Sequence, residues 1–217
     1  MDSNSLPITL KRLRAAAKKW RIPSVTQIAR EGDPFRVLVS TLLSLRTRDE
    51  VMEEAAERVF ALANNPRSML RIPPEKLQKA IYPVAFFRNK RRSLSALCQK
   101  LVAEYGGEVP DTLEELLALP GVGRKTANLT LILGFDKPGI CVDTHVHRIV
   151  NRWDYVRTRN PDETEMALRE SLPKRYWKEF NELLVAFGQN CCKPTSPICS
   201  ECPVEEFCRN RGVKKKR

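Results

Sequence analysis

The fold is decided by the stretch Leu119-Pro120-Gly121-Val122-Gly123-Arg124-Lys125-Thr126-Ala127. This stretch predicts the end of one helix, a tight Gly-x-Gly hairpin and the start of a second helix. Gly121 and Gly123 let the backbone turn sharply and carry no side chain that would keep a ligand away. The amide groups that open the second helix then form a site suited to an anion such as a phosphate.

The residues around the hairpin carry further predictions. Asp111 is a candidate N-cap for the first helix, with Glu114 as its capping-box partner. Lys125 falls in the first turn of the second helix, where the helix N-terminus and nearby cations disfavour the charged form of its amine. A lysine in that position can act as an amine nucleophile. With Asp143 eighteen residues further on, the pattern indicates chemistry on a nucleic-acid backbone.

The composition supports a basic, globular protein. The 217 residues include 38 Lys and Arg against 26 Asp and Glu, a net charge of +12, and 42% are hydrophobic. Such a charge is typical of nucleic-acid binders, because cations near phosphates release counterions; a merely soluble basic surface is the alternative. The sequence has no apolar run of ~20 residues and no signal-peptide pattern at its start. We therefore expect a cytoplasmic, nucleoid-associated protein without a membrane segment.

The sequence pattern is helical nearly throughout. After Asp33-Pro34, apolar residues recur at helical spacing as far as Leu45. No alternating run is long enough for a sheet, and short connections often marked by Pro are typical of helix bundles. The turn at residues 136–139 is the best internal boundary. Further helices are predicted over residues 49–63, 66–71, 74–81, 89–105, 112–118, 124–134, 145–152, 161–171 and 173–187.

Four of the seven cysteines lie close together in the sequence. Cys192, Cys199, Cys202 and Cys208 fall within seventeen residues, which favours a metal site over disulfides in an intracellular protein. Zinc usually takes two C-x2-C pairs, and only one is present. Iron–sulfur clusters accept uneven spacings and are favoured here, with zinc and unpaired thiols as alternatives. Cys191 is an alternative first ligand.

These signatures, in this order, resemble the endonuclease III family of helix-hairpin-helix DNA glycosylases. The resemblance extends from about Pro34 to Cys208 and is strongest over residues 119–128, over residues 142–145 and at the four cysteines. It implies an all-α protein with two domains. A six-helix domain with the hairpin would span residues 27–137, and residues 1–26 would join residues 138–217 in a cluster domain.

The resemblance also implies an activity, a bifunctional DNA glycosylase and apurinic/apyrimidinic lyase that removes oxidised pyrimidines. Lys125 would attack the sugar carbon as the damaged base leaves, and elimination from the resulting Schiff base would cut the strand on the 3′ side. Asp143 would accept a proton from the lysine or stabilise positive charge on the sugar. The four cysteines would hold a [4Fe-4S] cluster that shapes a DNA-contacting loop bearing Lys193.

The implied partner is double-stranded DNA that contains a damaged base or an abasic site, bound by a monomer. The flipped base would lie in a cleft between the domains, with Lys125 and Asp143 on opposite walls, because the sugar–base bond is out of reach inside a stacked duplex. The hairpin residues Gly121, Gly123 and Arg124 would contact the DNA.

Two positions depart from the family pattern. Arg46 stands where many members carry a glutamine that fills the gap left by the flipped base, and Phe86 stands where the apolar wedge is often leucine. An arginine can stack on the estranged base or donate hydrogen bonds to it. A phenylalanine can still intercalate and kink the duplex. The dependence on the opposite base is therefore expected to differ from the usual case.

Several residues have simpler structural interpretations. The pair His145 and His147 does not share a helix face, so orientation of the Asp143 segment is favoured over metal binding. Asp143 and Asp49 are also candidate helix N-caps. Cys98 and Cys141 are expected to be buried thiols. The tryptophans Trp20, Trp153 and Trp177 are expected in the core, and the basic run Arg88, Lys90, Arg91 and Arg92 is either an exposed helix start or a phosphate-binding patch.

Two other function classes remain open from the sequence. A monofunctional mismatch glycosylase for adenine or thymine is the first alternative, although such relatives usually replace the lysine with tyrosine or serine. A DNA-binding module without catalysis is the second, although a binding module has no need for Lys125 and Asp143.

Overall fold

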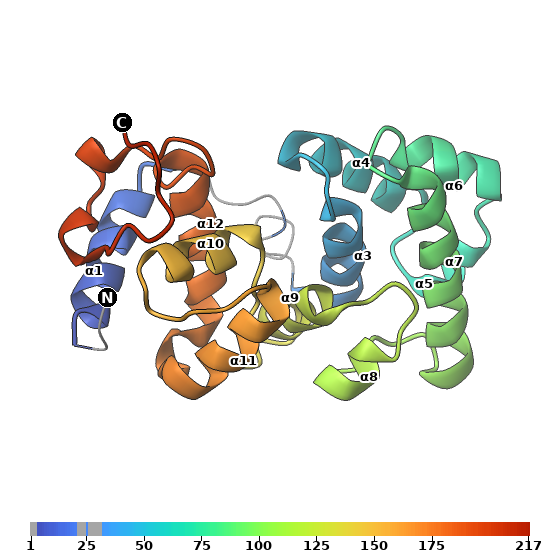
Figure 1. Cartoon of the computed structure of the whole chain (residues 1–217). Coiled ribbons are helices and arrows are strands. Elements are labelled where there is room, and N and C mark those ends of the chain that lie inside the picture. Colours follow the sequence, from blue (N-terminus) through green and yellow to red (C-terminus); the bar gives the residue numbers. More distant parts are fainter. Residues whose placement is uncertain (1–3, 21–24, 26–31) are drawn as a thin grey trace. The chain divides into compact units, whose positions relative to one another are not determined.

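The computed structural model describes residues 4–20, 25 and 32–217, and every regular element in this part of the chain is helical (Figure 1). The predicted all-α class is confirmed. None of the helices described is both long enough and apolar enough to span a bilayer.

The chain forms two compact units. One unit comprises Ser24–Gly139, and the other combines Met1–Pro23 with Ile140–Arg217. The predicted domain boundary between residues 26 and 27 falls outside the described residues. The division at residues 137 and 138 stays a prediction as well.

The Ser24–Gly139 unit is built around α3 (Pro34–Ser44), whose apolar side chains include Leu38, Leu42 and Leu43, all buried. This helix packs against α9, α4 and α7. Gly134 permits the close approach of α9 to α3, because a Cβ there would lie 2.9 Å from Pro34 Cα. The remaining helices are α4 (Asp49–Leu62), α5 (Pro66–Leu70), α6 (Pro74–Ile81), α7 (Phe87–Glu104), α8 (Leu113–Leu117) and α9 (Arg124–Gly134).

Helix starts in this unit follow local capping chemistry. The Asp33 carboxylate accepts from the Phe35 and Arg36 amides, which fixes the predicted start of α3. The predicted cap at Asp111 is wrong, because Thr112 caps α8 and accepts from the Glu115 amide at 3.3 Å. Asp111 instead pairs with Lys137 at 2.7 Å.

The N-cap predicted at Asp49 is also wrong. Arg48 occupies the cap position of α4, and Asp49 is the first helical residue. A carboxylate in the first turn still complements the positive end of the helix dipole. Asp49 therefore stabilises α4 as its first helical residue rather than as its cap.

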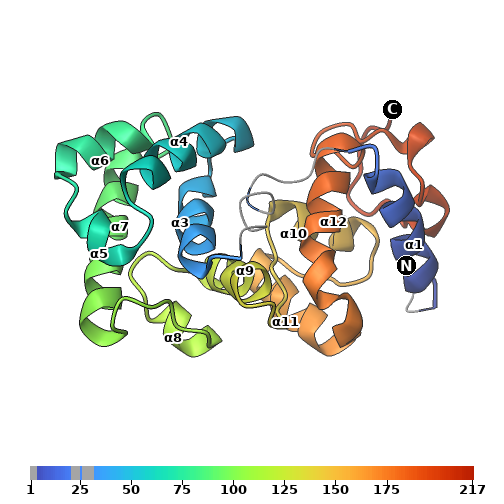
Figure 2. The same ribbon diagram turned by 180° about the vertical axis from the view of Figure 1, so that it is seen from behind.

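The other unit contains α1 (Leu6–Ala17), α10 (Thr144–Arg152), α11 (Pro161–Ser171) and α12 (Trp177–Asn190), with short 3-10 turns at Lys174–Tyr176, Cys199–Glu201 and Glu205–Phe207. Figure 2 shows α12 between α1 and α10, and α12 packs against both. Trp153 and Trp177 are buried in this core, and Trp20 packs against it and stacks on Phe187. The tryptophans therefore belong to the core, as predicted.

Candidate active site

The hairpin between α8 and α9 depends on a glycine at position 121. Gly121 has a φ of 78°, in the left-handed region that side chains rarely adopt. A Cβ there would also lie 3.0 Å from the Ser93 Cβ of α7. Gly123, the N-cap of α9, is exposed, and an added Cβ there would meet no atom within 4 Å. The hairpin backbone is thus fixed at Gly121 and accessible at Gly123.

Lys125 is the second residue of α9, directly after Arg124, and both are half-buried. The next residues, Thr126 and Ala127, are fully buried in the unit's interior. The Asn128 amide group donates to the Arg124 carbonyl at 3.0 Å within the same helix. These contacts fix the backbone from which the Lys125 amine projects, in the first turn predicted from the sequence.

Asp143 is the N-cap of α10, as predicted. Its Oδ1 accepts from the backbone amides of His145 and Val146, both at 2.9 Å. Both capping bonds fall on Oδ1, so Oδ2 takes no part in capping. Half-buried Asp143 therefore combines a fixed position with a carboxylate oxygen available for another role.

The two histidines lie on different sides of α10. The Nδ1 of His147 lies 2.7 Å from Thr164 Oγ1, whereas His145 Nδ1 lies 3.1 Å from Arg148 Nη2. Burial lowers the pKa of His147, and Glu163 opposes this shift. Both histidines are thus bound into the packing of the helix that Asp143 caps.

The cysteine-rich segment lines a small cavity that is partly open to solvent. Its lining includes residues that the sequence does not single out, among them Arg152, Phe187 and Asn210. All four predicted ligands reach it, and so does Cys191, whose thiol donates to the Ile198 carbonyl. The sulfur-lined cavity contains the five side chains Cys191, Cys192, Cys199, Cys202 and Cys208.

The donor set of this cavity fits an iron–sulfur cluster. Arg152 Nη1 donates to Cys192 Sγ, and the Asn210 amide donates to Cys208 Sγ, both at 3.3 Å. N–H donors to sulfur are a means by which proteins tune such clusters. Within the described residues, no three His, Cys, Asp or Glu side chains gather around a point suited to one metal ion. A multi-iron cluster does not need that arrangement, because each cysteine binds a different iron.

The protonation of these thiols bears on cluster assembly. Burial raises the pKa of Cys208 to about 11 and also raises that of Cys199. The pKa of Cys202 is also raised, first by its hydrogen bond with the Cys191 thiol and then by burial. Because iron takes thiolates as ligands, cluster assembly must displace these protons.

Helix α10 supports the cavity through two arginines that the sequence analysis did not identify. Arg152 donates to the Lys193 carbonyl at 2.7 Å and to the Pro194 carbonyl at 2.6 Å. Arg148 donates to the Cys192 carbonyl at 2.8 Å. The spacing of four residues on one helix face was the available signal, but their acceptors lie about forty residues further along the chain.

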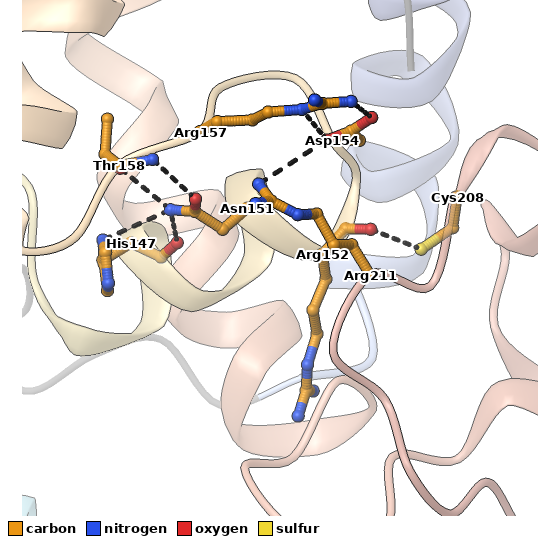
Figure 3. Close-up of polar contacts among 8 residues, drawn as sticks. All are labelled: His147, Asn151, Arg152, Asp154, Arg157, Thr158, Cys208 and Arg211. Carbon is orange, nitrogen blue, oxygen red and sulfur yellow. Dashed lines mark hydrogen bonds and ion pairs between the residues drawn. The ribbon is translucent and has the colours of Figure 1, made fainter.

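The C-terminal end of α10 is joined to the same segment. The Arg152 carbonyl accepts from the Cys208 thiol at 3.7 Å and from the Arg211 amide at 3.0 Å. Figure 3 shows the first of these contacts, together with the ion pair between Asp154 and Arg211. Asn151 braces the following loop, because its side chain bonds the Thr158 backbone amide and hydroxyl. One helix thus connects Asp143 at its start with the cysteine segment at its end.

Arg46 and Phe86 lie together, although forty residues separate them in the sequence. The Arg46 guanidinium carbon lies 5.6 Å from the centroid of the Phe86 ring, within the range of a cation–π contact. Both residues have left-handed backbones, with φ of 55° and 57°. Phe86 is 59% exposed, so the pair presents an aromatic ring and a cation at the surface of its unit.

The basic run at the start of α7 is not one surface patch. Arg88 and Arg92 are exposed, but Lys90 is buried, with 7% of its surface exposed. Its amine donates to the carbonyls of Leu43 and Leu45 and to the Thr47 hydroxyl. The exposed position expected for Lys90 is therefore wrong.

The remaining thiols match their predictions. Cys98 and Cys141 are both buried, and burial raises the pKa of Cys98 to about 12. Cys98 therefore stays neutral.

Comparison with known proteins identifies the family. The model for HhH-GPD superfamily base excision DNA repair proteins matches residues 39–174. Endonuclease III of Thermotoga maritima is 50% identical over 186 residues, which cover 84% of this chain and 87% of that protein. The chain belongs to the endonuclease III family. Endonuclease III of Bacillus subtilis is 36% identical, over 86% of this chain and 85% of its own length.

Solved structures of endonuclease III agree. A trapped covalent intermediate of endonuclease III with DNA, an estranged-adenine complex, superimposes with a TM-score of 0.85 at 31% identity and covers 97% of each chain. The chain is accordingly a base-excision repair enzyme, a DNA glycosylase with apurinic/apyrimidinic lyase activity. This confirms the predicted family and activity.

Proposed function

We propose that this enzyme removes oxidised pyrimidines from double-stranded DNA through a Schiff base on Lys125. The observation that carries the proposal is the position of Lys125, which is the second residue of α9 and lies two residues after Gly123, whose backbone is accessible. Buried neighbours on both α9 and α3 hold that backbone in place. A nucleophile needs such a fixed approach to the reacting carbon.

In the proposed reaction, the Lys125 nitrogen forms a bond to the sugar C1′ while the bond from C1′ to the damaged base breaks. The base leaves with the bonding electrons and takes up a proton, and opening of the sugar ring gives the protonated Schiff base. Loss of a proton from C2′ then expels the 3′ phosphate, and water releases the enzyme. Asp143, through Oδ2, takes the proton from the lysine or stabilises positive charge on the sugar.

The proposed DNA contacts have distinct tasks. Gly121, Gly123 and Arg124 offer backbone amides and a cation to a phosphate, since the start of a helix attracts anions. Lys193 adds a cation from the loop that Arg152 anchors. Arg46 and Phe86 fill the gap that the flipped base leaves and contact the opposite base.

We assign a [4Fe-4S] cluster to Cys192, Cys199, Cys202 and Cys208. Their side chains line one cavity, and N–H donors reach two of the sulfurs. When bound, the cluster would hold the loop that carries Lys193 in shape. Every proton and bond in the excision reaction is handled by side chains outside the cavity.

The test is borohydride trapping on duplexes that contain thymine glycol or an abasic site. Wild type should form a covalent complex on both, and Lys125→Ala should form none while still binding DNA. Lys137→Ala is a matched control, because this half-buried lysine of the same unit pairs with Asp111 through both its carboxylate and its carbonyl. A trapped complex with Lys125→Ala would assign the nucleophile to another amine.

Asp143 needs a second test, because it also caps α10. Asp143→Asn keeps an acceptor for the His145 and Val146 amides and removes only the charge. We expect single-turnover base release by this variant to fall about a hundredfold, with its thermal stability close to wild type. An unchanged rate would reduce Asp143 to a helix cap.

We further propose that the enzyme acts as a monomer in the cytoplasm, in association with the nucleoid. The bacterial relatives with similar lengths support the cytoplasmic location. Gel filtration at the concentrations used for activity assays tests the monomer, and a mass twice that of the chain would overturn it.

A further inference from the structure

Lys90 uses all of its hydrogen-bonding capacity on one short segment. Its amine lies 2.7 Å from the Leu43 carbonyl, 2.6 Å from the Leu45 carbonyl and 3.0 Å from the Thr47 hydroxyl. A protonated lysine has three donors and no acceptor, so these three contacts saturate it. The segment that accepts them is the end of α3 and the turn that contains Arg46.

Thr47 connects the Arg46 turn to the loop that contains Ala85 and Phe86. Its hydroxyl donates to the Leu45 carbonyl at 3.3 Å and accepts from both Lys90 and the Ala85 amide, the latter at 3.1 Å. A hydroxyl has one donor and two acceptor positions, and all three are used. Ala85 directly precedes Phe86, so Thr47 joins the two loops.

The two residues held in this way have costly backbones. A left-handed conformation in a residue other than glycine costs of order 1–3 kcal/mol and persists only where the surroundings enforce it. Arg46 lies between two acceptors of Lys90, and Phe86 lies between Ala85 and the first turn of α7, where its carbonyl accepts from the Lys90 amide. Backbone hydrogen bonds from Thr47 to Ser44 and from Phe87 to Val84 close the two turns, and the side chains of Lys90 and Thr47 tie the turns to each other.

The choice of lysine has a physical reason. The carbonyls at the end of α3 have no partner within the helix, and a cation there complements the negative end of the helix dipole. A neutral side chain of similar length, such as methionine, would fill the space without satisfying either carbonyl. Burial of Lys90 excludes water as a substitute donor.

We propose that Lys90, together with Thr47, is a positioning residue that sets Arg46 and Phe86 in place and so determines how excision depends on the base opposite the lesion. This inference rests on the proposed function, in which Arg46 and Phe86 contact the opposite base. Lys90 itself touches no DNA. Its effect is therefore on selectivity among opposite bases rather than on the chemistry at the sugar.

The experiment compares single-turnover excision of thymine glycol from four duplexes that differ only in the opposite base. Wild type should show a clear spread among the four rates. Lys90→Met should narrow that spread to within about threefold, since each misplaced hydrogen bond removes roughly a tenfold preference. Lys100→Met is the control, because Lys100 lies on the same helix and contacts Glu104 and Ala118 instead; it should keep the wild-type spread.

A double-variant cycle separates positioning from general damage. If Lys90 acts through Arg46 and Phe86, then Lys90→Met combined with Arg46→Ala should lose less selectivity than the two single losses multiplied together. Independent, multiplying losses in the double variant would overturn the inference. So would a wild-type spread in Lys90→Met, or equal rates opposite all four bases in wild type.

Thr47 provides a milder route if Lys90→Met folds poorly. Thr47→Val removes the hydroxyl and should narrow the spread, whereas Thr47→Ser retains the hydroxyl and should restore it. A wild-type spread in Thr47→Val would overturn the inference. Borohydride trapping of wild type on a preformed abasic site, run in parallel, tests the proposed lysine chemistry alone, so that failure of either idea is recognised separately.

Discussion

Two buried cations, one in each unit, each hold a loop by donating hydrogen bonds to it. One is an ammonium group and the other is a guanidinium group. Lys90 is 7% exposed and donates to two carbonyls and a hydroxyl in the Arg46 turn. Arg152 is 9% exposed and donates to two carbonyls and a sulfur in the cysteine segment. Lysine is a compact point charge, and arginine is a flat fork that reaches several acceptors in one plane.

The difference lies in what else supports each loop. The Arg46 turn is held by protein contacts alone, with Thr47 as the second support. The cysteine segment would be held by the cluster as well as by Arg152. Loss of Lys90 should therefore alter the selectivity among opposite bases. The cysteine segment, in contrast, should lose its structure mainly when the iron is lost.

The largest effect is expected from loss of the cluster, which is the second support of the cysteine segment. Cys192→Ser should lose most of the bound iron and about 5 kcal/mol or more of the free energy of unfolding, because metal binding is coupled to folding. Iron content and chemical denaturation measure the two effects. Cys191→Ser is the matched control from the same cavity. Should Cys191→Ser lose the iron instead, the first ligand would be Cys191.

The next largest effect is expected when the support from Arg152 is removed. Arg152→Ala leaves the Lys193 and Pro194 carbonyls without their buried donor, at a cost of about 3 kcal/mol. We expect a lower unfolding midpoint and faster loss of iron to a chelator. Arg157→Ala, which removes an exposed pair with Asp154 nearby, should change both by little. Equal iron retention in wild type and Arg152→Ala would mean that the cluster alone shapes the loop.

Exchanging the two cations sharpens the comparison further. Arg152→Lys cannot span all three acceptors and should cost about 1–2 kcal/mol. Lys90→Arg must fit a larger, flat group into a filled site and should cost about 1–3 kcal/mol through overpacking. Denaturation curves of both variants against wild type measure these losses. Two neutral exchanges would show that only the charge matters at these positions.

Much of the molecule was predictable because its signals are local. The Asp33 and Asp143 caps, the glycine hairpin and the apolar spacing of α3 each depend on a few neighbouring residues. Helix α7 begins at Phe87 rather than 89, and the predicted helix at 173–187 divides into a 3-10 turn and α12. Such shifts are small because helix ends depend on weak local preferences.

Most of the predictions that differ from the structure share a feature: the contacts that decide them are not visible in the local sequence. At Asp111 two adjacent residues both suit a cap; Thr112 bonds the side chain and the amide of Glu115, whereas Asp111 pairs with the distant Lys137. Helix α1 went unpredicted, although Leu6, Leu10 and Leu13 have helical spacing and are buried. Lys90 and Arg152 were missed because their acceptors lie roughly forty residues away in the sequence, and no local pattern indicates a cation that becomes buried.

The smallest expected effect is the pH dependence of the Lys90 support. Burial lowers the pKa of Lys90 to about 8 from its ordinary value of 10.5. Between these values the unfolded chain binds the proton and the folded chain does not, so raising the pH favours the folded state; below about 8 both states are protonated and the contribution is constant. The free energy of unfolding of wild type should therefore rise relative to Lys90→Met by about 1–2 kcal/mol from pH 8 to pH 10.

Paired urea denaturations of wild type and Lys90→Met at several pH values measure this difference. Taking the difference cancels the titration of all other groups. A difference that stays flat would mean that the three acceptors keep Lys90 protonated in the folded state.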